Sequence, residues 1–270
     1  MILSDATDRR FHQSKALISF PSPLTSSSLF CKIEKDLFHQ EIPKLSGNKS
    51  KKKKIAIIIV AVAIAVIITL ATPFIVLAGR TSALKSDYSY LKTDKTYSVK
   101  AEVSGIELVT QHVSCGYATI EMLSAFYGNK VTEDELSDKN NGGVSTSSSG
   151  GFLKEINASI PGHNFTKHEY LKNDELLKSI HDALSSGHPV AIEWAAKYEG
   201  EWTLHFSVVT CLNLAADVVT VYNPYGYVEN ITAKELLERT SFRAYENIPL
   251  FLQFGFAFGA FDKNIVFFAE

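Results

Sequence analysis

The longest apolar run of the chain lies at residues 55–78, IAIIIVAVAIAVIITLATPFIVLA, and carries no charge over 24 positions. A helix rises about 1.5 Å per residue, so a helix of this length spans about 36 Å, more than the bilayer core of about 30 Å. A buried helix of a small soluble domain rarely contains so long an uncharged run. The pattern therefore predicts a transmembrane helix or signal anchor in contact with the lipid bilayer.

Charge around this run predicts its orientation. Lys51–Lys54 immediately precede it, whereas only Arg80 and Lys85 follow closely. The positive-inside rule then keeps the N-terminus in the cytoplasm and places the rest of the chain outside. Small residues near Ala78 also fit a signal-peptidase site, so secretion after cleavage there stays open beside a single-pass membrane protein.

Helical periodicity dominates the first part of the body. Ser114 is a good N-cap, apolar residues recur at helical spacing behind it, and Gly128 is a natural stop, so a helix is expected with Cys115 as its first residue. Residues 140–151, NNGGVSTSSSGG, form either a flexible connection or the wall or lid of a cleft. Further helices are predicted at 132–139, 152–160, 173–187 and 231–240.

Strand-like patterns dominate the second part. Residues 204–214 and 217–223 are β-branched runs joined by a turn near Ala215–Asp217, which indicates an antiparallel hairpin. Further strands are predicted at 189–196, 249–261 and 264–270. Helices followed by strands indicate an α+β domain with a mostly antiparallel sheet. The expected organisation is a disordered basic cytoplasmic tail at 1–54, the membrane segment at 55–78, a linker at 79–104 and a domain at 105–270.

Composition narrows the function. Residues 1–54 carry 11 Lys and Arg against 5 Asp and Glu, whereas the remainder carries 16 against 24, with no basic stripe that would suggest nucleic acid. The cysteines, Cys31, Cys115 and Cys211, have no C-x-x-C or zinc-like spacing, so neither a metal site nor a cofactor is expected. A disulfide between Cys115 and Cys211 stays open.

Candidate chemistry gathers around Cys115. A helix N-terminus stabilises a thiolate, although a cysteine is also often just a small buried residue. His205 begins an apolar strand, and Asn223 ends the returning strand of the hairpin 18 residues later. The side-chain oxygen of Asn223 can accept the imidazole N–H there, or Asn223 is an ordinary turn residue. Cys211 lies about 20 Å along the strand from His205, too far to react with it. Gln111 is either an oxyanion donor or a polar loop residue.

Three segments, QHVSCGYATIEMLSAFYG at 111–128, LHFSVVT at 204–210 and VYNPYGY at 221–227, together resemble the papain-like cysteine peptidases. The resemblance is to the bacteriocin-leader peptidase branch, family thirty-nine, and runs from Leu108 to the C-terminus. It implies a papain-like α+β fold, with Cys115 as nucleophile, His205 as general base and acid, Asn223 as the orienting residue and Gln111 as oxyanion donor.

The same resemblance implies a bacterial, thiol-dependent peptidase that cuts peptide or protein substrates through a thioester, here outside the membrane. Two features depart from the family. Gln111 stands closer to the cysteine than usual, and no transporter segment accompanies the domain, so leader processing is not expected. The alternatives are an inactive papain-like binding module and an acyl or peptidyl transferase that uses the same three residues.

Overall fold

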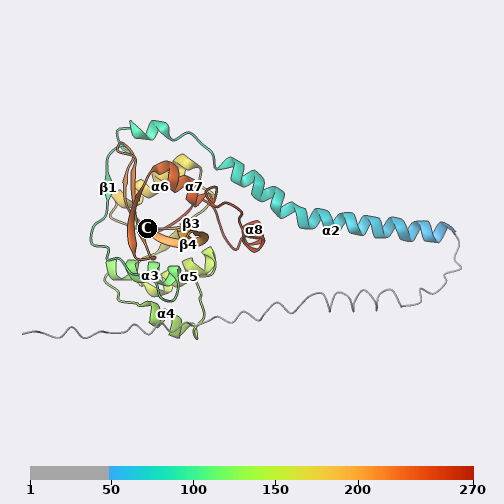
Figure 1. The fold of residues 1–270 in the computed structure, drawn as a ribbon, viewed down its shortest axis with the longest axis horizontal. Coiled ribbons are helices and arrows are strands. Elements are labelled where there is room, and N and C mark those ends of the chain that lie inside the picture. The colour runs from blue at the N-terminus through green and yellow to red at the C-terminus, as the bar shows by residue number, and fades with distance from the viewer. Residues whose placement is uncertain (1–48) are drawn as a thin grey trace, which may run out of the picture. The chain divides into compact units, whose positions relative to one another are not determined.

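The computed structural model describes residues 49–270 (Figure 1). Residues 1–48 of the disordered tail predicted for 1–54 therefore lie outside the described residues. The chain divides into two compact units, residues 1–62 and 63–270. Helix α2 (Lys49–Ala83) runs from the first unit into the second.

Helix α2 contains the predicted membrane segment. Its most apolar 18-residue window, within Lys51–Ala83, has a mean hydropathy of 3.1 and is not buried by the rest of the chain. The hydroxyls of Thr69 and Thr72 donate to the carbonyls of Ala65 and Ile68, at 2.8 and 2.7 Å. These side chains are therefore satisfied within the helix, as an apolar surrounding requires. The prediction of one helix long and apolar enough to cross a membrane is confirmed.

A seven-stranded antiparallel sheet forms the centre of the second unit. Its order is β2-β7-β3-β4-β5-β6, and β1 pairs with β4 beside this path. The strands are β1 (Ala101–Glu102), β2 (Phe165–His168), β3 (Val190–Tyr198), β4 (Glu201–Asn213), β5 (Val218–Asn223), β6 (Tyr227–Ile231) and β7 (Ile265–Ala269). The sheet and the helices before it confirm the α+β prediction, including the hairpin of β4 and β5.

Helices cover both faces of the sheet, because β3 and β4 are apolar on both faces and need cover on each. Along β3, Ile192 and Trp194 face a core shared with α6 and α7, whereas Ala191 faces a core shared with α3, α4 and α5. Figure 1 shows α6 and α7 on one side of β3 and β4, and α3 and α5 on the other. The helices are α3 (Cys115–Phe126), α4 (Glu133–Lys139), α5 (Ser149–Ser159), α6 (Asn173–Ser185), α7 (Ala233–Thr240) and α8 (Leu250–Ala257).

Helix α8 corrects one prediction, because a strand was expected at residues 249–261. The segment is almost uniformly apolar, and a short apolar run fits a buried strand or a helix equally well by periodicity. The helix is fixed by packing: Leu252 and Phe256, four residues apart, are buried against Phe242, and the ring of Phe261 packs on Gly255, where a Cβ would lie 2.3 Å from the ring.

Residues 79–104 also differ from the expected linker. Leu84 is buried, and so is Leu91, which belongs to a 3-10 helix at Ser89–Lys92. Further along the segment, β1 pairs with β4. The buried positions are too widely spaced to produce a periodic pattern, which is why the sequence does not reveal them. This segment packs as part of the domain.

Candidate functional site

Cys115 begins α3, at a turn held by hydrogen bonds from both sides. The hydroxyl of Ser114 accepts the N–H of Tyr117 at 3.1 Å, which confirms the predicted N-cap. The buried carboxylate of Glu133, at the start of α4, accepts the N–H groups of Val113 and Ser114, each at 2.9 Å. The position of Cys115 is therefore fixed by backbone groups immediately before it.

The sulfur of Cys115 lies against strand β4. Burial raises the pKa of the thiol to about 11, and the nearby backbone N–H groups of Phe206 and Gly116 oppose this rise. Because Phe206 directly follows His205, this proximity puts the sulfur beside the peptide that carries the histidine. Cys115 and Cys211 are both free cysteines, so the disulfide left open by the sequence is not formed.

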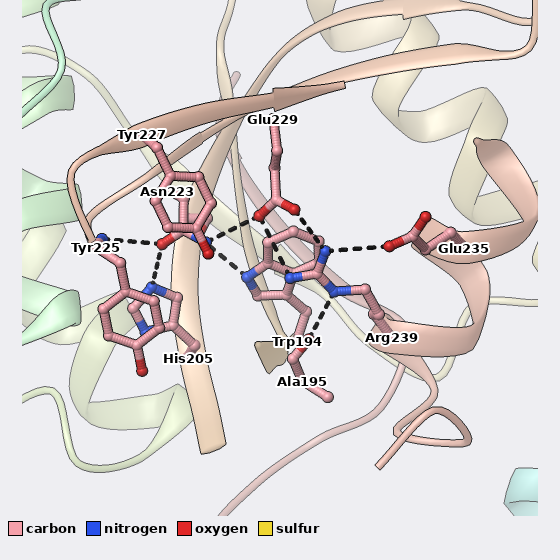
Figure 2. A network of polar contacts seen from close by, with 10 residues as sticks. Trp194, Ala195, His205, Asn223, Tyr225, Tyr227, Glu229, Glu235 and Arg239 are labelled. Atoms are coloured by element: carbon pink, nitrogen blue, oxygen red, sulfur yellow. Dashed lines mark hydrogen bonds and ion pairs between the residues drawn. The ribbon is translucent and has the colours of Figure 1, made fainter. Parts of the chain in front are cut away.

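His205 and Asn223 meet as the hairpin predicts. Nε2 of the imidazole lies 2.8 Å from Oδ1 of Asn223, and Oδ1 also accepts the N–H of Tyr225 at 3.0 Å (Figure 2). An amide oxygen only accepts, so Nε2 carries the proton and Nδ1 of the neutral ring has a free lone pair. Burial lowers the pKa of His205 to about 3, although the hydrogen bond with Asn223 opposes the shift. The ring is neutral at physiological pH.

A charged pair lies behind Asn223 (Figure 2). Its Nδ2 donates to Oε1 of Glu229 at 2.9 Å and to the hydroxyl of Tyr227 at 3.2 Å. Arg239 donates to the same carboxylate, with one nitrogen 2.8 Å from Oε2, and its Nε donates to the carbonyl of Ala195 at 2.8 Å. The guanidinium carbon lies 3.4 Å from the ring centroid of Trp194, a stacked cation–π arrangement.

Tyr225 covers the imidazole. Its ring stacks on His205 with centroids 4.0 Å apart and an angle of 21° between the planes. Its hydroxyl lies 2.7 Å from that of Thr203 on β4, and the ring of Tyr198 packs at 4.8 Å. These contacts fix the turn after β5 over the histidine and keep water from one face of the ring.

The structure thus joins His205 to Asn223 and sets Cys115 next to the peptide after His205. Among residues 49–270, no hydrogen bond joins the sulfur of Cys115 to either ring nitrogen of His205. The thiol and the imidazole are adjacent neutral groups in this conformation.

Gln111 lies at the same edge. Its backbone N–H donates to the carbonyl of Pro224 at 2.8 Å, which ties the strand end carrying Asn223 to the segment before Cys115. Its Oε1 is buried, and in the part of the chain that the structure describes it has no hydrogen-bond partner. The side chain is near the site, and its predicted role as an oxyanion donor stays a prediction.

The Ser- and Gly-rich loop at 140–151 packs on the start of α3 beside Cys115, and its predicted role as the wall or lid of a cleft stays a prediction. Thr146 is buried directly over Gly116, where a Cβ would lie 2.2 Å from the Thr146 hydroxyl. The hydroxyl of Tyr117 donates to the carbonyl of Gly143 at 2.9 Å and accepts the N–H of Ser145 at 2.9 Å. Only a glycine after Cys115 allows this close approach.

Glu193 lies on β3 opposite Phe206 and contacts the end of the same loop. The hydroxyl of Ser149 donates to its Oε2 at 2.6 Å. Burial raises the pKa of this carboxyl to about 8, which makes it predominantly protonated at neutral pH. Its negative form would lie near Cys115 and disfavour the thiolate.

Sequence reasoning missed Glu229, Arg239, Tyr225 and Glu193. Glu229 lies on β6, whose sequence YVENI is short and polar and gives no strand signal. Arg239 is a charged residue on a helix and reads as exposed, although it is buried. Glu193 alone could have been found from the sequence, because it is a charged residue within the otherwise apolar run 189–196.

The chain matches a protein-family model and several solved structures. The family model described as "Peptidase_C39 like family" matches residues 103–249. A crystal structure of a double glycine motif protease from an AMS/PCAT transporter, in complex with the leader peptide, is 14% identical, with 62% of this chain and 94% of that chain covered and a TM-score of 0.40. The comparison with curated proteins finds no match.

Proposed function

Because the chain belongs to the Peptidase_C39-like family of cysteine peptidases, we propose that it hydrolyses peptide bonds of a peptide or protein substrate with Cys115. The expected family resemblance and the papain-like fold are confirmed. Membership alone does not make a chain active, so the activity is argued from the site. The observation that carries it is the hydrogen bond between His205 and Asn223, with Cys115 packed in the core that contains Phe206, the residue after the histidine.

In the proposed reaction, Nδ1 of His205 takes the proton of the Cys115 thiol as the sulfur attacks the substrate carbonyl. Asn223 holds the imidazole through Nε2 and stabilises the positive charge on the ring. The imidazolium then protonates the leaving amine, which leaves a thioester. Water, deprotonated by His205, attacks this thioester and releases the acid and the free thiol.

The oxyanion formed in each step needs donors. The backbone N–H of Cys115 is free of an intrahelical bond, because it is the first residue of α3. Nε2 of Gln111 is the second proposed donor, supported by the position of Gln111 next to Pro224.

We also propose that α2 spans the membrane once, with the N-terminus in the cytoplasm and the peptidase domain outside. The four lysines at Lys51–Lys54 and the apolar stretch behind them support this topology. Cleavage near Ala78 and secretion is the alternative. Labelling of an exposed cysteine introduced by Val99→Cys, with an impermeant reagent on intact cells, tests the side on which the domain lies.

A second function, a catalytically silent binding module, is favoured by one observation. A thiol with a pKa of about 11 and an imidazole with a pKa of about 3 do not form a thiolate–imidazolium pair at neutral pH. Peptidyl transfer with the same residues differs from hydrolysis only in the acceptor of the thioester.

A peptidyl electrophile that requires an active site separates peptidase from module. We expect the full-length chain to be labelled at Cys115, faster than an unfolded peptide containing the same cysteine. Cys115→Ala removes the label, while Cys211→Ala keeps it, because Cys211 lies in the β1–β4 pairing away from His205. Labelling no faster than the unfolded peptide, or labelling at Cys211, contradicts the peptidase proposal.

A further inference from the structure

Helix α8 presents an apolar face that the domain does not cover. Its inner residues, Leu252 and Phe256, are 5% and 3% exposed and pack in a core with Phe242. Its outer residues are 66%, 70%, 43% and 60% exposed. These four outer residues, called here the α8 face, are Leu250, Phe251, Phe254 and Phe258.

The composition around this face makes contact with water unfavourable. Phe251, Phe254 and Phe258 are three and four residues apart, so they project from one side of the helix. No charged residue occurs from Ile248 to Phe261. Soluble proteins rarely expose grouped large apolar side chains, and such groups mark interaction sites.

The α8 face is continuous with the apolar surface of α2. The ring of Phe74 meets that of Phe254 edge-on at 5.2 Å and that of Phe258 at 6.4 Å. All three residues belong to the unit formed by residues 63–270. Phe74 lies within the apolar run 55–78, whose remaining side chains are also largely exposed.

We infer that the α8 face inserts into the interfacial region of the same bilayer that α2 crosses. Its occupant is lipid, because the face adjoins a segment that is itself suited to lipid. An aromatic face without charges gains by entering the boundary between headgroups and acyl chains. This inference rests on the proposed membrane anchoring, and it adds a second contact that fixes the orientation of the domain on the membrane.

Quenching by brominated lipids tests this in the full-length chain reconstituted into phosphatidylcholine vesicles. A tryptophan is introduced by Phe251→Trp, and the emission of Trp194 and Trp202 is subtracted with the unmodified chain. Val99→Trp, at an exposed position beside α6, is the matched control outside the α8 face. Ile64→Trp, within α2, reports membrane insertion of the span itself.

We expect brominated lipid to quench the tryptophans at positions 251 and 64 and to leave that at position 99 unchanged. Quenching at position 64 without quenching at 251 overturns the inference and leaves the anchoring intact. Absence of quenching at both overturns the anchoring as well. If the emission at position 251 is not quenched by brominated lipid but changes with the protein-to-lipid ratio, a second copy of the chain covers the α8 face. That result also overturns the inference.

A second inference rests on the separate network around Asn223. A side-chain amide can turn over and present either its oxygen or its nitrogen to His205. A carboxylate only accepts, so Glu229 at 2.9 Å requires Nδ2 of Asn223 to face it and leaves Oδ1 for His205. Arg239 pairs with Glu229 at 2.8 Å and holds that carboxylate in place.

We propose that Glu229 is a positioning residue that sets the tautomer of His205 through Asn223. With Oδ1 facing the ring, the proton stays on Nε2 and Nδ1 is free to act as the base. In Glu229→Gln, the new amide turns its oxygen to Arg239 and its NH₂ to Asn223. Asn223 then turns its own NH₂ to His205, its Oδ1 gives up the hydrogen bond from the Tyr225 N–H, and the ring proton moves to Nδ1. This role rests on the proposed function, in which Nδ1 takes the thiol proton.

Nitrogen NMR of the full-length chain with labelled histidines reads the tautomer without any activity assay, and the loss of a signal in His205→Gln assigns the ring. We expect the proton on Nε2 in the unmodified chain and on Nδ1 in Glu229→Gln. Glu235→Gln is the matched control, because Glu235 also pairs with Arg239, at 3.5 Å, but does not contact Asn223. A ring proton that stays on Nε2 in both variants overturns the inference.

Rescue distinguishes positioning from support of the fold. In Glu229→Gln the ring proton on Nδ1 also blocks the base, so the labelling rate of Cys115 falls. Adding Asn223→Asp supplies an acceptor to His205 in either orientation, so the proton returns to Nε2 and the labelling rate of Cys115 recovers. If neither returns although the doubly substituted chain is folded, the positioning role is wrong. If the tautomer follows these expectations and no variant cuts peptides, the peptidase proposal fails and the positioning role stands.

Discussion

The ionisation state of Cys115 gives a prediction with a magnitude. Burial raises the pKa of this thiol from 9.0 to about 11. The thiolate is thereby disfavoured by about 3 kcal/mol, or ~100-fold, because one pH unit corresponds to about 1.4 kcal/mol. We therefore expect iodoacetamide, which reacts with the thiolate, to modify Cys115 ~100-fold more slowly at neutral pH than an exposed cysteine of the ordinary pKa.

The pH profile carries the stronger test. The alkylation rate at Cys115, followed by peptide mass mapping of the full-length chain, rises about tenfold per pH unit up to about pH 11. His205→Gln leaves this slope unchanged, because a ring with a pKa of about 3 is already neutral above pH 5. A plateau of high reactivity between about pH 5 and 8 that disappears in His205→Gln would refute the reasoning, since it requires a thiolate–imidazolium pair at rest.

Three further predictions concern stability, measured by denaturant unfolding of the full-length chain in detergent. Gly116→Ala costs about 1–3 kcal/mol, because the new Cβ displaces Thr146, whereas Gly150→Ala, with no neighbour within 4 Å, is neutral or better; equal effects contradict this. Burial raises the pKa of Glu193 from 4.5 to about 8, so the folded chain keeps a proton that the unfolded chain releases. As the pH rises from about 4.5 to about 8, the free energy of unfolding therefore falls by about 1.4 kcal/mol per pH unit. Glu193→Gln flattens this fall, and an unchanged slope in that variant contradicts the prediction. Thr132→Ala removes the capping box of α4 and costs about 1 kcal/mol, and no loss would contradict its capping role.

Much of the fold could be predicted because local signals agree with the final packing. Ser114 and Thr132 cap α3 and α4 as expected, and the turn after Leu214 brings β5 back along β4. The hairpin alone predicts that Asn223 lies close to His205, since its strands pair antiparallel and the register follows from the turn. These features depend on neighbours in sequence, and the sequence contains them.

What could not be predicted depends on contacts between distant segments. Phe251 and Phe254 alternate with other apolar residues in a way that suits strand or helix, and only the packing of α8 decides. Leu91 is buried in the core that α6 and β4 also line, although its own segment is polar. Glu229 and Arg239 lie on elements with no visible pairing in sequence, so the support behind Asn223 emerges only in three dimensions.

Peptide hydrolysis by Cys115 is the central claim, and isotope incorporation tests it most directly. The full-length chain in bilayers is incubated with a mixed peptide library in H₂¹⁸O, and new C-termini are read by mass spectrometry. We predict new C-terminal carboxylates carrying ¹⁸O with the unmodified chain and none with Cys115→Ser. Peptides joined to new amines without ¹⁸O would make the chain a transferase. No new termini at all, or equal cleavage by Cys115→Ser, would contradict the claim.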